Sequence, residues 1–115
     1  MDDAAQMRRI DALLAHVWMV RAFLKHSEEA QDDDELAGVH RELYDYMLAL
    51  GAPLKENDPA TYLKLATKKF SKLRQATELF AKIQPEVSAH TNFQMAAASL
   101  TTAVSEIGEL LRPSN

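Results

Sequence analysis

The segment LAHVWMVRAFLKHSEE, residues 14–29, decides the fold of this chain. It contains the only tryptophan and two of the four histidines, and from Ala12 to Leu24 only His16 and Arg21 are polar. Apolar residues that recur at the helical period of 3.6 indicate an α-helix, and here they continue nearly all the way round it. Such a helix is buried on more than one side, so we expect it at the centre of a helical bundle.

Three further stretches with the helical period follow, separated by turn residues. Gly51 followed by Pro53 is typical of a helix end, Asp58-Pro59 of a helix start, and Pro85 of another end. Short loops join antiparallel neighbours. The pattern therefore predicts an all-α, up-down-up-down four-helix bundle as a single domain over residues 1–115, with helices at 3–30, 34–50, 58–83 and 91–111.

Composition narrows the class of protein further. The chain has 115 residues, of which 47% are hydrophobic and 26% charged, as in an ordinary folded domain. A net charge of −4 offers no basic field for nucleic acid or an anionic membrane surface. The absence of cysteine excludes disulfides and thiol chemistry. The longest apolar run, 12–24, is shorter than the roughly 20 residues that span a bilayer. We expect a cytoplasmic protein that binds neither nucleic acid nor membrane.

A few polar residues fall on the inward faces of the predicted helices. At about 1.5 Å per residue, Arg21 and His40 lie at a similar depth, roughly 12–16 Å, below the turn between the first two helices. Thr77 lies at a comparable depth on the third helix. The pattern predicts one shared polar layer, bordered by Tyr44, with Glu28 as the counter-ion of Arg21.

Two interpretations of this layer remain open. It is either a pocket in which Arg21 holds a small anionic or polar ligand beside a proton-exchanging His40, or a structural feature. In the structural case the polar residues satisfy one another, or Arg21 extends out between two helices and places its charge in water. Buried polar networks are commonly structural, which favours the second interpretation.

The outer face of the first helix carries apolar residues that point away from its core stripe: Ala15, Trp18, Met19 and Ala22. An exposed apolar patch usually marks an interface. Small residues beside a tryptophan and a methionine also allow another helix to approach closely. This face predicts a homodimer.

One end of the bundle gathers possible metal ligands, namely His26, Glu29 and His90. Two imidazoles and a carboxylate can bind a divalent cation. The Glu-x-x-His repeat of di-iron bundles is absent, however. We therefore favour ordinary polar helix-end residues here and expect no cofactor.

These observations rank three functions. The first is a non-enzymatic protein-interaction module that self-associates through the first helix. The second is a ligand-binding bundle, and the third is a protein with a metal site. No nucleophile or metal set surrounds the histidines, so catalysis is disfavoured.

Overall fold

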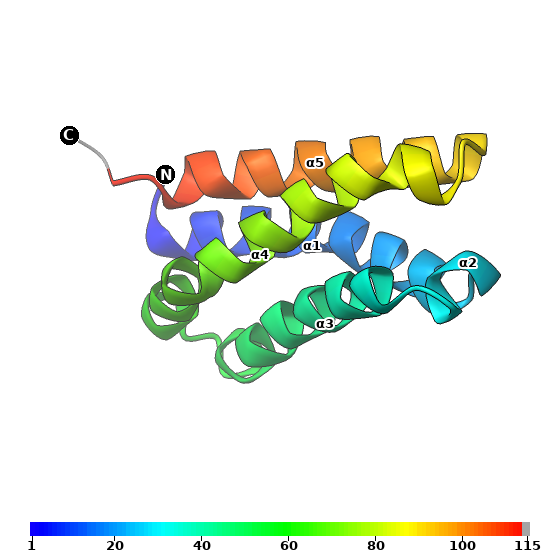
Figure 1. Ribbon diagram of the computed structural model, residues 1–115. Coiled ribbons are helices and arrows are strands. Elements are labelled where there is room, and N and C mark those ends of the chain that lie inside the picture. Colours follow the sequence, from blue (N-terminus) through cyan, green and yellow to red (C-terminus); the bar gives the residue numbers. More distant parts are fainter. Residues whose placement is uncertain (114–115) are drawn as a thin grey trace.

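Five helices make up the computed structural model, which describes residues 1–113 of the 115. They are α1 (Asp3–Lys25), α2 (Glu28–Gln31), α3 (Asp34–Lys55), α4 (Pro59–Val87) and α5 (Thr91–Leu111). The four long helices alternate in direction, and α1 and α4 each pack against both α3 and α5 (Figure 1). The described residues contain no strand, so the all-α, up-down-up-down bundle is confirmed.

The first helix is shorter than the sequence predicts. Instead of continuing to residue 30, α1 ends at Lys25, and the one-turn helix α2 follows. The cause is Ser27, whose hydroxyl accepts a hydrogen bond from the Ala30 backbone N–H at 3.0 Å. Serine favours the N-cap because its side chain replaces a missing backbone partner there. The chain therefore changes direction after Lys25, and Glu28 no longer lies on the same helix face as Arg21.

Two prolines lie inside the last turns of helices, where the sequence predicts helix ends. Pro53 lies within α3, which continues past the predicted end at Leu50 to Lys55. Pro85 lies within α4, which continues past Ile83 to Val87. Each proline removes the backbone donor that would bond to the carbonyl four residues earlier, yet both helices continue for two more residues. Both helix ends were thus predicted too early.

The helix start at Asp58-Pro59 is confirmed. The Asp58 carboxylate accepts from the Thr61 backbone N–H at 3.2 Å. Hydrogen bonding from Thr61, first from its side chain and then from its backbone, lowers the pKa of Asp58. Asn57, just before it, adopts a positive φ of 52°, which asparagine tolerates better than most residues. The reversal between α3 and α4 therefore depends on Asn57, while Gly51 stays helical.

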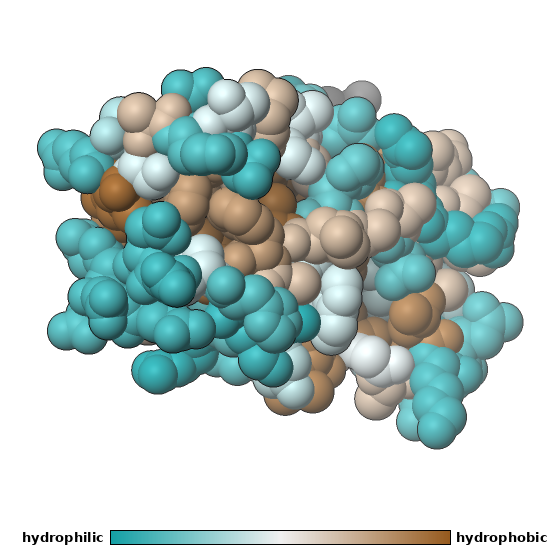
Figure 2. Space-filling model, turned by 90° about the vertical axis from the view of Figure 1, so that its right-hand side faces the viewer, coloured by the Kyte–Doolittle hydropathy of each residue, from teal (hydrophilic) through white to brown (hydrophobic). Residues whose placement is uncertain are grey.

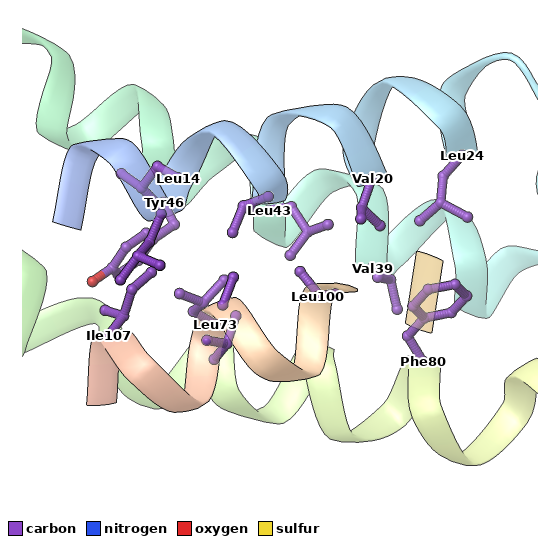
Figure 3. Close-up of a cluster of buried hydrophobic side chains, with 14 of the residues drawn as sticks. Leu14, Val20, Leu24, Val39, Leu43, Tyr46, Leu73, Phe80, Leu100 and Ile107 are labelled. Carbon is purple, nitrogen blue, oxygen red and sulfur yellow. The ribbon is translucent and has the colours of Figure 1, made fainter. Parts of the chain in front are cut away.

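A continuous apolar core fills the space between the four long helices (Figure 3). In Figure 3 the side chains of α1 and α3 meet those of α4 and α5 in layers along the bundle. The labelled members are Leu14, Val20, Leu24, Val39, Leu43, Tyr46, Leu73, Phe80, Leu100 and Ile107. This core holds α1 and α3 in a fixed relation, which positions the residues of the candidate site.

None of the helices in the described part of the chain is long and apolar enough to cross a membrane. Figure 2 views the end of the bundle that carries α2. Hydrophilic side chains cover much of this end, and apolar ones show between them.

Candidate functional site

The candidate site lies where the outer faces of α1 and α3 meet. Three large side chains stand out from this surface: Trp18 is 47% exposed, Met19 66% and Tyr44 41%. Ala15 is also exposed, and Ala22 is half-buried. Three of the four residues predicted to face outward on the first helix are thus exposed, and the homodimer stays a prediction.

A hollow of about 440 Å³ lies on this surface, between the middle of α1 and the C-terminal half of α3. Its walls include Trp18, Met19, Met47 and Leu54, with Ala15 and Gly51 between them. Of the described residues that line it, only Asp11 is charged. We call this hollow the apolar groove. Its shape combines protruding side chains with small ones, which is what a partner helix needs for close packing.

Arg21 lies directly behind the aromatic residues and is only 7% exposed. Its guanidinium carbon lies 4.0 Å from the centre of the Trp18 ring and 5.7 Å from that of Tyr44. A cation over an aromatic face is stabilised by the ring's quadrupole. Two rings therefore supply part of the stabilisation that water would otherwise give this charge.

His40 is the hydrogen-bond partner of Arg21. Nη1 of Arg21 donates to Nε2 of His40 at 3.2 Å. Since a guanidinium has no acceptor, Nε2 carries no proton and the imidazole is neutral, with its proton on Nδ1. Burial lowers the pKa of His40, and the positive charges of Arg21, Lys25 and Arg41 lower it further. The geometry and the pKa direction agree on a neutral His40.

Among residues 1–113, Arg21 has no carboxylate as a counter-ion. Within residues 1–113, no acidic group lies within 4.0 Å of its guanidinium, and its Nε has no hydrogen-bond partner. The predicted counter-ion, Glu28, is exposed and belongs to α2. The expected pair fails because α1 ends before Glu28.

Thr77 is buried on α4, but its hydroxyl donates to the Leu73 carbonyl at 2.8 Å within the same helix. This bond already satisfies the hydroxyl. Of the five residues predicted for the ligand pocket, the structure thus brings Arg21, His40 and Tyr44 together. Thr77 and Glu28 contribute no contact to that group.

A second hollow, of about 340 Å³, opens on the α2 side of His40. Its lining includes Lys25, His40 and Arg41, and no carboxylate belongs to it. Leu24, Ala30 and Leu36 supply an apolar floor. We call this hollow the cationic hollow. Lys25 and Arg41 were not among the predicted site residues. Their signal was present, since Lys25 follows Arg21 by one helical turn and Arg41 adjoins His40.

The predicted metal ligands do not assemble. Among residues 1–113, no group of three or more histidines and acids could hold a metal ion. His26 caps the end of α1, and Glu29 lies exposed on α2. His90 caps α5 instead, because its Nδ1 accepts from the Asn92 backbone N–H at 3.0 Å.

Two buried tyrosines, Tyr46 and Tyr62, are further polar features of the core. The Tyr46 hydroxyl donates to the Ala66 carbonyl at 2.9 Å, whereas the Tyr62 hydroxyl has no partner among the described residues. Burial raises the pKa of both phenols well above the usual value. Both hydroxyls therefore stay protonated at any physiological pH.

The chain matches no protein-family model, no curated protein and no solved structure.

Proposed function

We propose that this small helical bundle is a non-enzymatic interaction module and that its partner is a second copy of the same chain. The contact surface is the outer face of α1 with the apolar groove beside it. One observation carries the proposal: Trp18, Met19 and Tyr44 are exposed on the same side of the molecule, next to the groove.

Leaving these side chains in water is costly. A tryptophan buries up to about 250 Å², so the exposed half of Trp18 is on the order of 100 Å² of mostly apolar surface. At about 25 cal/mol per Å², covering it contributes ~2.5 kcal/mol per copy. A symmetric dimer gains this contribution twice. Tryptophan and tyrosine are also the residue types that dominate binding energy at protein interfaces.

A second copy suits the surface because the surface is complementary to itself. Trp18 and Met19 protrude, while Ala15 and Gly51 leave room beside them. In a two-fold dimer about an axis near Trp18 and Met19, the protruding residues of both copies meet at the centre and the small residues lie on either side of them.

Sedimentation velocity over a wide concentration range tests the proposal. Met19→Glu places a charge in the contact, so we expect it to shift the equilibrium strongly toward monomer. Met95→Glu on α5 is a matched control, since Met95 is 59% exposed and lies on another face. A wild-type chain that stays monomeric at several hundred micromolar overturns the proposal, as does equal weakening by both variants.

The cationic hollow favours a second candidate function, the binding of a small anion such as phosphate. Lys25 and Arg41 have no acidic group within 4.0 Å in residues 1–113, and Arg21 stands uncompensated behind His40. Calorimetric titration with inorganic phosphate tests it. Arg41→Gln should abolish binding, whereas Arg8→Gln, at the other end of α1, should leave it unchanged. Absence of heat with the wild type rejects this candidate.

A further inference from the structure

Along the outer face of α1, similar residue types lie at similar distances on either side of a central pair, except that the charges at the two ends have opposite signs. Along the helix this face carries Asp11, Ala15, the pair Trp18–Met19, Ala22 and Lys25. Each alanine lies three to four residues from the central pair, and each charge a further turn away. At about 1.5 Å per residue, Asp11 and Lys25 each lie roughly 10 Å from the centre. One end of the stripe is negative and the other positive.

These two charges have no oppositely charged partner among residues 1–113. Asp11 and Lys25 are both exposed. Neither forms an ion pair with any other residue in 1–113. The neighbouring Arg9, in contrast, binds Glu106 of α5 at 2.7 Å. The charges at the two ends of the stripe are thus free to meet a partner.

We infer that two copies pack α1 against α1 in antiparallel orientation, about a two-fold axis that passes near Trp18 and Met19. The inference rests on the proposed self-association and specifies its register. Ala15 of each copy lies opposite Ala22 of the other, so only small residues face each other on either side of the central Trp18–Met19 pair. Asp11 of each copy lies opposite Lys25 of the other, and the two-fold axis makes this ion pair twice.

The charges also exclude the alternative orientation. A parallel two-fold pair places Asp11 against Asp11 and Lys25 against Lys25. Like charges at an interface disfavour the wrong arrangement and so help to fix the register. In the antiparallel pair the helix dipoles also run in opposite directions, so that each positive end lies near a negative one.

Two charge-reversal variants test the register. Asp11→Lys leaves only lysines at both ends of the stripe, and Lys25→Glu leaves only acids. Each variant alone replaces both attractive pairs of the symmetric dimer by repulsive ones. We therefore expect a rise in the dimer dissociation constant of about tenfold or more at low salt.

Mixing the two variants restores attraction, because each lysine of one chain then faces an acid of the other. We expect the 1:1 mixture to form a heterodimer with nearly the wild-type dissociation constant, measured by sedimentation velocity in phosphate-free buffer. Lys82→Glu on α4 is the net-charge control for Lys25→Glu, since it makes the same change of charge away from α1. Circular dichroism establishes that each variant is folded. If either reversal lowers helicity, Asp11→Asn and Lys25→Gln replace the pair, each expected to weaken the dimer less.

The outcomes separate the two proposals. A wild-type monomer refutes self-association itself. A wild-type dimer whose dissociation constant is unchanged by both reversals leaves self-association standing and overturns the antiparallel register. Variants that are weak alone and remain weak when mixed also overturn it.

Discussion

Replacing Arg21 by methionine removes a buried charge that has no carboxylate within 4.0 Å in the described residues 1–113. Methionine matches the arginine side chain to about the position of Nε, so it replaces the apolar stem and removes the guanidinium that lies over Trp18 and Tyr44. We expect the free energy of unfolding to change by no more than about 1 kcal/mol, or to rise. This outcome would be unusual for a buried arginine that holds a fold together.

The magnitude follows from the contacts of Arg21. The substitution loses two cation–π contacts, each worth about 0.5–2 kcal/mol. It also loses the charged hydrogen bond to His40, worth about 1.5–3 kcal/mol. Against this, the desolvation of an uncompensated guanidinium costs several kcal/mol, and the substitution removes that cost. A thioether beside two rings recovers about 0.3–1.5 kcal/mol per ring. Losses and gains nearly cancel.

Urea unfolding followed by circular dichroism measures the effect. Ellipticity is preferable to fluorescence because the only tryptophan touches the substituted side chain. All samples are compared at one low protein concentration, since dimer formation would raise the apparent stability. Arg21→Ala is the comparison variant. It removes the stem as well, and the cavity should lower the free energy of unfolding by ~2–4 kcal/mol.

A loss of more than about 3 kcal/mol in Arg21→Met would refute this reasoning, because losses of that size are typical of a broken, well-compensated buried pair. Arg21 would then be a structural residue, and the binding of a ligand beside it would lose support. A proton NMR titration adds a second readout. The pKa of His40 should move toward its usual value when Arg21 is removed, although burial, the largest cause, still holds it lower.

Three further predictions concern pH and single side chains. Because the pKa of His40 is lower in the folded state than its usual 6.5, the unfolded chain takes up the proton first as the pH falls. Stability should therefore decrease as pH falls from about 6.5 through the folded-state pKa, and His40→Gln should remove this component of the urea midpoint's pH dependence. Tyr62→Phe should leave the free energy of unfolding unchanged or raise it, whereas Tyr46→Phe should lower it by about 1 kcal/mol; equal losses would contradict the assigned hydrogen bonds. Gly38→Ala should raise the melting temperature, with a gain of about 0.5–1 kcal/mol, because nothing lies within 4 Å of the added Cβ. A melting temperature that falls would show that this position of α3 is crowded.

The period of the apolar residues predicts the fold well, because a helix buries one whole face and that face needs apolar residues at every turn. The common depth of Arg21 and His40 also follows from period and rise alone, and the two side chains do meet at 3.2 Å. Both inferences use only residues within one uninterrupted helix each.

The incorrect predictions share a physical cause, namely local hydrogen bonds that the period ignores. Ser27 ends the first helix by capping the next, which removes Glu28 from Arg21. Thr77 satisfies its hydroxyl on the preceding turn of its own helix, so it takes no part in the polar layer. At Pro53 the error has the opposite sign, because a local signal predicts a helix end that packing overrides. The proline is buried within α3, and the helix continues to Lys55. A hydroxyl or a ring nitrogen has several possible partners, and the sequence does not rank them.

The start of α1 and the end of α5 lie at the same end of the bundle, as Figure 1 shows. The side chain of Gln6 donates to the Leu110 carbonyl, and Arg9 binds Glu106 across the same seam. A short peptide linker could therefore join the two ends and close the four helices into a ring. New ends opened at Asn57, on the exposed turn between α3 and α4, would leave every helix intact. Such a circularly permuted chain would keep the outer face of α1 uncovered. Its new termini would lie away from that surface, so that a fusion partner could be attached without blocking it.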